Sequence, residues 1–170
     1  MSTKRSAATS TADGDLQSAI DAALRNVYDP EIPTLSVLDL GMVLDVVCRE
    51  GTAHVKMIPT FVGCPALSFI QKRVEQAVLD VDGVVDAEVE FDLDGAWTTE
   101  RISEAGREKL REFGIAPPQC SLREMQRLTA LCPYCGSSHT RLENLFGPTA
   151  CRSVFYCEDC RQPFEAMKPV

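Results

Sequence analysis

The sequence predicts an α+β fold, with a small mixed three-stranded sheet and helices, followed by a C-terminal zinc ribbon. Two observations lead to this fold class. Apolar residues recur first with helical and then with strand periods, in the order α, β, β, α, β, α. Two CxxC pairs then follow at the spacing of a four-cysteine metal site. We expect an α+β domain over residues 15–114 and a zinc ribbon over 128–170, with a disordered tail over 1–14 and a linker over 115–127.

The first helix is expected where five apolar residues share one helical face. They are Leu16, Ile20, Ala23, Leu24 and Val27. Asp13 or Asp15 can cap the N-terminus of this helix. Pro30 and Pro33 end it, because proline lacks a backbone donor and forces extended geometry.

Three strands and two more helices complete the predicted domain. The strands are expected over residues 42–49, 52–59 and 84–93. The third alternates apolar and acidic residues, which is typical of a strand with one wet face. The second helix runs to about Leu79, and its crossover makes the second and third strands parallel. Ser103 can cap the last helix, and Gly114 ends it.

Cys64 lies where the second strand ends and the second helix begins. Free N–H groups and the helix dipole favour a thiolate there. A thiolate can attack an electrophile or bind a soft metal. The alternative is a small apolar residue packed under a loop.

The two CxxC pairs are separated by 21 residues and predict a structural zinc site. Their members are Cys132, Cys135, Cys157 and Cys160. Rubredoxin-like iron and a redox dithiol remain as alternatives. Four sulfurs leave no open position on the metal, so the site is expected to stabilise the fold rather than to hydrolyse a substrate.

The other cysteines are harder to assign. Cys151 is expected near the tip of the ribbon hairpin, either as a small partly buried residue or as an extra metal ligand. Cys48 falls on a strand and is expected in the core. Cys120 falls in the linker and has no predicted role. His139 could replace a cysteine at zinc, although four sulfurs are already present.

Composition narrows the functional classes. The net charge is −8, which disfavours nucleic acid as a partner. No apolar run approaches the ~18 residues of a membrane span, and the N-terminus lacks a secretory apolar region. We therefore expect a cytoplasmic protein, in which eight cysteines serve metal or thiol chemistry rather than disulfides. No nucleotide-binding, HExxH or GxSxG motif is present.

Three short motifs together resemble the MIP18 family, also called DUF59, over about residues 16–114. They are Asp29-Pro30-Glu31-Ile32-Pro33, Asp39-Leu40-Gly41 and Thr60-Phe61-Val62-Gly63-Cys64-Pro65. With the cysteine-rich tail added, nearly the whole chain resembles the PaaD family of phenylacetate degradation. The tail contributes the two CxxC pairs and Phe146-Gly147-Pro148-Thr149-Ala150-Cys151.

The resemblance implies an accessory protein, not an enzyme, that assembles or transfers an iron–sulfur cluster. It implies service to the multicomponent phenylacetyl-CoA epoxidase, especially to its [2Fe–2S] reductase. The family's reactive cysteine corresponds to Cys64 and its motif acid to Asp39, while Thr60 lies in the cysteine motif. A [2Fe–2S] cluster takes four ligands. Cys64 would therefore need a second protomer of a homodimer, a partner, a small thiol or a neighbour such as Cys151.

Two other functions remain open. The chain could be a structural or electron-transfer subunit of the epoxidase, or a cysteine-dependent enzyme acting on an acyl-CoA. The enzyme would need a histidine base, and only His54 is near Cys64 in sequence. Asp39 could supply an oxygen ligand, hydrogen-bond the cluster site, or simply cap the turn before Gly41.

Overall fold

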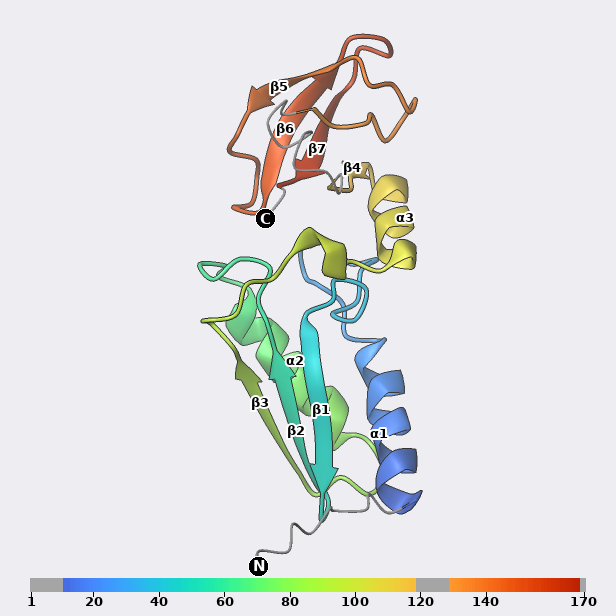
Figure 1. Cartoon of the computed structure of the whole chain (residues 1–170), viewed down its shortest axis with the longest axis vertical. Coiled ribbons are helices and arrows are strands. Elements are labelled where there is room, and N and C mark those ends of the chain that lie inside the picture. Colours follow the sequence, from blue (N-terminus) through green and yellow to red (C-terminus); the bar gives the residue numbers. More distant parts are fainter. Residues whose placement is uncertain (1–10, 119–128, 169–170) are drawn as a thin grey trace, which may run out of the picture.

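The N-terminal domain is built on the three-stranded sheet that the alternating patterns predict (Figure 1). β1 (Val43–Arg49) and β2 (Thr52–Met57) form an antiparallel hairpin. Its two turn residues, Glu50 and Gly51, both have positive φ, as a tight hairpin turn requires. β3 (Asp86–Phe91) lies parallel to β2, which confirms the predicted crossover through the second helix.

The structure is a computed structural model that describes residues 11–118 and 129–168. Among these residues, the helices lack the length and hydrophobicity that a transmembrane span needs.

Two helices cover the sheet. α1 (Thr11–Leu24) packs against β1 and α2, and α2 (Leu67–Leu79) packs against β3. The predicted tail is partly wrong, because α1 already begins at Thr11; residues 1–10 lie outside the described residues. The helix starts before Asp13 and Asp15, so both residues lie within α1 rather than ahead of it. Cys48 is buried in the core between sheet and helices, as predicted.

A third helix leads from the sheet towards the C-terminal domain. After a single 3-10 turn, η1 (Thr99–Arg101), α3 spans Glu104–Glu112. Ser103 is its N-cap, because the Ser103 side chain accepts a hydrogen bond of 2.9 Å from the Gly106 N–H. Gly114 then takes a positive φ and turns the chain into the next strand, as the sequence predicts for a helix end.

The C-terminal domain is a four-stranded sheet with the order β4-β7-β6-β5. The strands are β4 (Ile115–Ala116), β5 (Thr140–Asn144), β6 (Arg152–Cys157) and β7 (Pro163–Met167). Phe155 and Phe164 stack in its small core, with ring centroids 5.7 Å apart. β4 corrects the predicted linker, because residues 115–116 pair in parallel with β7. Residues 119–127 of that linker, including Cys120, lie outside the described residues.

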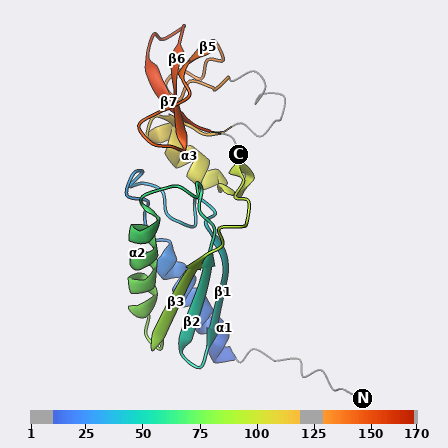
Figure 2. The ribbon, with the colours of Figure 1, turned by 90° about the vertical axis from the view of Figure 1, so that its left-hand side faces the viewer.

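The two domains meet at one end of the first sheet. The two parallel strands β2 and β3 both point towards the ribbon, so the loop after β2 faces it (Figures 1 and 2). Ile115 and Met167 from the ribbon sheet are buried with the core of the first domain. The loop that carries Cys64 is therefore placed at the junction between the domains.

Candidate functional site

Cys64 lies in the loop between β2 and α2 and is partly exposed. Its N–H donates a hydrogen bond of 3.1 Å to the carbonyl of Phe61, which closes the loop into a turn. The N-cap of α2 is Ala66, so Cys64 sits just before the helix rather than within it. This position agrees with the prediction that Cys64 lies at or next to the helix N-terminus.

The expected thiolate-favouring surroundings of Cys64 are not found. Burial raises the pKa of the Cys64 thiol, and the nearby Cys151, Asp29 and Glu31 raise it further. The N–H of Ala66 lowers this pKa, but a single backbone donor does not offset the lost hydration and the surrounding negative charge. The sequence prediction failed mainly because the fold partly buries the thiol, and in smaller part because the two acids and Cys151 come from segments remote from the helix.

A cavity of about 180 Å³ opens between the two domains, and Cys64 lines it. Thr60 lines the cavity from the same loop, as its place in the motif suggested. On the ribbon side, Thr149 and Cys151 line it from the segment just before β6. The hydroxyl of Thr149 and the sulfur of Cys151 lie 3.3 Å apart. Two thiols that are far apart in the sequence thus share one cavity.

Three charged residues that the sequence analysis did not single out also line this cavity: Asp29, Glu31 and Arg152. Asp29 accepts a hydrogen bond of 2.7 Å from the Glu31 N–H and so shapes the turn that presents both acids. The DPE motif contained a signal for these two acids, because its residues were quoted for the resemblance. Nothing in the sequence pattern distinguished Arg152.

Arg152 joins the two domains. It is 6% exposed, and its guanidinium donates to Glu165 within the ribbon at 2.7 Å and to the carbonyl of Glu31 at 3.2 Å. Its Nε–H has no hydrogen-bond partner among the described residues. A buried donor without a partner costs free energy, and the surrounding side chains must move before an acceptor from outside the chain can reach this atom.

Asp39 does not line the cavity. Its carboxylate accepts hydrogen bonds from the N–H and hydroxyl of Ser36 at 3.0 and 2.8 Å, and pairs with Lys109 of α3 at 2.7 Å. Burial raises the pKa of Asp39, but the bonds from Lys109 and Ser36 outweigh it, so the pKa lies below its ordinary value. The carboxylate is therefore fully engaged in capping its turn and holding α3.

The two residues after Asp39 also have structural roles. The carbonyl of Leu40 accepts a hydrogen bond of 2.9 Å from the buried indole N–H of Trp97. Gly41 has φ of 63°, and a Cβ added there would lie 2.3 Å from the carbonyl oxygen of Arg101. The DLG motif thus fixes the segment that leads into α3.

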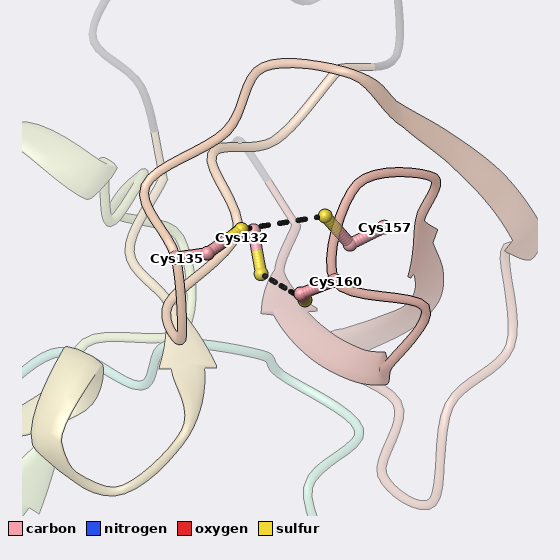
Figure 3. A group of neighbouring side chains, drawn as sticks. All are labelled: Cys132, Cys135, Cys157 and Cys160. Carbon is pink, nitrogen blue, oxygen red and sulfur yellow. Dashed lines mark hydrogen bonds between the residues drawn. The ribbon is translucent and has the colours of Figure 1, made fainter.

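A second site lies in the ribbon, where Cys132, Cys135, Cys157 and Cys160 converge (Figure 3). Their four sulfurs lie within 4.8 Å of one another, and the closest cross-loop pairs are 3.6 Å apart. A tetrahedral zinc with bonds of about 2.3 Å requires sulfurs about 3.8 Å apart, so the cluster fits such an ion. Backbone N–H groups of Cys160 and Asp159 lower the pKa of Cys157 to about 7, whereas burial and the neighbouring sulfurs raise the pKa of Cys160 to about 12, so Cys157 ionises first and a bound metal ion would displace the proton of Cys160.

Neither histidine joins a site within the described residues. His139 pairs with Asp159 at 3.3 Å on the surface, outside the four-sulfur cluster. His54 pairs with Glu88 at 3.0 Å on the open face of the first sheet. No histidine lines the cavity that contains Cys64, so the described chain offers no imidazole base for a cysteine nucleophile there.

Two family models match the chain. An iron–sulfur cluster assembly protein family matches residues 17–91, and the PaaD zinc beta ribbon domain matches residues 116–168. The first match covers β1 to β3, α2 and Cys64. The second covers all four ribbon cysteines and Cys151.

Individual relatives agree with these matches. An Escherichia coli protein, provisionally assigned as a component of 1,2-phenylacetyl-CoA epoxidase, is 38% identical over 150 residues, which is 86% of this chain and 89% of the relative. A Porphyromonas gingivalis Fe-S protein maturation auxiliary factor is 38% identical over 93 residues, 54% of this chain and 85% of that protein. The crystal structure of a DUF59 domain from Bacillus anthracis covers 60% of this chain and 97% of its own, with a TM-score of 0.56 and 27% identity.

These matches confirm the predicted MIP18-like α+β fold and the C-terminal ribbon. The similarity to the Escherichia coli protein extends across both domains. The chain therefore belongs to the family of that epoxidase component, which joins an iron–sulfur cluster assembly domain to a PaaD zinc ribbon.

Proposed function

We propose that this chain is a non-enzymatic accessory protein of a phenylacetyl-CoA epoxidase system. Its substrate is an iron–sulfur cluster, which Cys64 receives and passes to the [2Fe–2S] reductase component. The observation that carries the proposal is the partly exposed thiol of Cys64 in an open cavity, within a domain of the iron–sulfur assembly family. The relative named as an epoxidase component supports the choice of recipient system.

The chemistry of the cavity suits a ligand that is held only for a time. Binding iron removes the proton from the thiol, so affinity falls when that proton is held more tightly. Because burial and the neighbouring acids raise the pKa of Cys64, iron competes with a well-held proton. A weakly held cluster is what transfer to another protein requires.

Exposed apolar side chains beside Cys64 support contact with a recipient protein. Phe61 and Val62 precede Cys64 in the loop and are 43% and 56% exposed, and Phe69 on α2 is 48% exposed. Apolar groups that gather at the surface mark sites of protein contact. The recipient can therefore be recognised next to the thiol that delivers the cluster.

We propose zinc as the resident metal of the ribbon. The four-cysteine donor set and the sulfur spacing fit this ion, and it supplies the cross-link that so small a ribbon core lacks. The zinc would stabilise the ribbon and take no part in transferring the cluster.

The test is anaerobic reconstitution of the zinc-loaded full chain with ferrous iron and sulfide. We expect wild type to bind iron that desalting removes slowly, Cys64→Ala to bind almost none, and both to keep their zinc. The reductase, produced with and without this chain, should contain less iron when the chain is absent. Equal iron in wild type and Cys64→Ala would refute the role of Cys64.

A structural role within the assembled epoxidase is the second candidate, favoured by the name of the Escherichia coli relative. It predicts that this chain co-purifies with the oxygenase in a fixed ratio. Full turnover of the purified complex without this chain would exclude that candidate.

A further inference from the structure

The two thiols in the interdomain cavity come from different domains. Cys64 belongs to the iron–sulfur assembly domain and Cys151 to the ribbon, and both are partly exposed in the same cavity. Cys151 is not one of the four clustered ribbon cysteines. Neither thiol is therefore engaged by the ribbon metal site.

We propose that Cys64 and Cys151 together form a two-thiolate site that binds one iron of the transferred cluster across the domain junction. This inference rests on the proposed function and identifies its second protein ligand. As each sulfur binds iron, its proton leaves to solvent, and no electrons are exchanged. Two thiolates from this chain leave the other iron of a [2Fe–2S] cluster for ligands of the recipient.

The rest of the cavity fits a cluster in this position. Arg152 lines the cavity, is nine-tenths buried and has an Nε–H without a partner in the described chain. Once the side chains that cover Nε move aside, a cluster sulfide is an acceptor for this donor, and hydrogen bonds to the sulfurs stabilise a cluster. Apart from the four ribbon cysteines, no three metal-binding side chains of the described residues converge. The cavity thus offers two thiolates and open positions, not a closed set of ligands.

The ribbon fold fixes where Cys151 lies. The N–H of Lys168, just after β7, donates a hydrogen bond of 2.9 Å to the carbonyl of Cys151. The N–H of Arg152 donates to the carbonyl of Thr149 at 3.1 Å, which closes the turn that holds Cys151. Arg152 then ties this turn to Glu31 in the first domain. The ribbon thereby has a second use, which is to present a ligand to the thiol of the other domain.

The test compares iron and sulfide retained by zinc-loaded full-length variants after anaerobic reconstitution and desalting. The variants are Cys64→Ala, Cys151→Ala, the double variant, and Cys48→Ala as a control for a buried cysteine outside the cavity. We expect the iron retained by each cavity variant to fall more than ~10-fold below wild type, since losing only an outer-shell partner of a metal ligand already costs about that much affinity. The double variant should be no worse than either single variant, and Cys48→Ala should match wild type.

The outcomes separate this inference from the proposed function. If Cys151→Ala retains as much iron as wild type while Cys64→Ala does not, the two-thiolate site is wrong and the role of Cys64 stands. If Cys64→Ala also retains full iron, both are wrong. Zinc content and Trp97 fluorescence show in each case that the variant is folded.

A second measurement tests the geometry without iron. Dibromobimane becomes fluorescent when it has joined two thiols, and the zinc-loaded ribbon cysteines are protected from it. We expect an intramolecular product that contains Cys64 and Cys151 in wild type and in Cys48→Ala, and none in either cavity variant. Absence of this product in wild type would overturn the shared site.

Discussion

Replacing Asp39 tests whether the motif acid binds the cluster or only holds the fold. In Asp39→Ala, the N–H of Ser36 loses its acceptor, and Ser36 is 2% exposed. A buried donor left unpaired costs about 1–3 kcal/mol. The ion pair with Lys109 adds little, about 0.2–1 kcal/mol, because the Lys109 side chain is 39% exposed. We therefore expect Asp39→Ala to lower the free energy of unfolding by about 2–3 kcal/mol.

Asp39→Asn is the informative partner of that variant. Its amide oxygen can still accept the hydrogen bond from Ser36, so we expect a loss of about 1 kcal/mol from the missing charge and acceptor. The backbone carbonyl at position 39, which accepts the Ser103 N–H at 2.9 Å, is unchanged. Iron uptake should match wild type, because the Asp39 carboxylate does not line the cavity.

The assay is urea denaturation followed by the fluorescence of Trp97, the only tryptophan, whose indole N–H is bonded to Leu40 beside the substituted position. The pH dependence gives an internal check. The folded-state pKa of Asp39 is lowered, so its contribution is present above the unfolded pKa of about 3.9 and is lost as pH falls through the lower folded value. The stability difference between wild type and Asp39→Asn should shrink in that acidic range.

One pattern would refute this reasoning. If Asp39→Asn unfolds within about 0.5 kcal/mol of wild type, yet binds as little iron as Cys64→Ala, the carboxylate acts as a ligand or contacts the cluster. The structural assignment of the motif acid would then be wrong.

Two further substitutions, one of them with a matched control variant, test other parts of the fold. Gly41→Ala should destabilise the first domain by about 3 kcal/mol or more, since φ at this position is 63° and the new Cβ would meet the Arg101 carbonyl. The control is Gly14→Ala in α1, where a Cβ has open space, so stability in the same urea assay should be equal to wild type or higher. Equal urea midpoints for Gly41→Ala and Gly14→Ala would contradict the clash. Cys157→Ser should lose the ribbon metal, and a strong chelator should remove it from wild type. In both cases we expect limited proteolysis to cut the ribbon while Trp97 in the first domain stays buried. Metal analysis that still finds one metal per chain in Cys157→Ser would count against the four-sulfur site.

Local sequence patterns predicted the parts of the fold that depend on local chemistry. The end of α2 near Leu79 and the cap of α3 by Ser103 were predicted, because periodicity and capping depend on near neighbours. The parallel pairing of β2 with β3 was predicted from a general rule for strands joined by a helix. β4 was missed because its two residues are too short to show a period. The first turn of α1 was missed because its residues are small and polar and add nothing to an apolar face.

The candidate site was predictable only in its individual residues. The motifs indicated Cys64 and the ribbon cysteines, since their chemistry is visible in type and spacing. The pKa of Cys64 was predicted in the wrong direction, because the burial of its thiol and, to a smaller extent, the approach of Asp29, Glu31 and Cys151 arise only through the tertiary fold. Arg152 was missed for the same reason: an arginine beside a cysteine looks like any surface residue until two domains bury it.

A continuous path connects the motif acid to the second thiol, although the acid binds no part of the cavity. Asp39 pairs with Lys109 and so holds α3 against the loop. α3 continues through Gly114 into β4, which pairs with β7, and the residue after β7 donates a hydrogen bond to Cys151. Each step along this path is a covalent chain connection, a backbone hydrogen bond between strands or turns, or an ion pair. The position of Cys151 relative to Cys64 therefore depends on the whole path. An acid can thus stabilise the framework around a metal site without being a ligand of the metal.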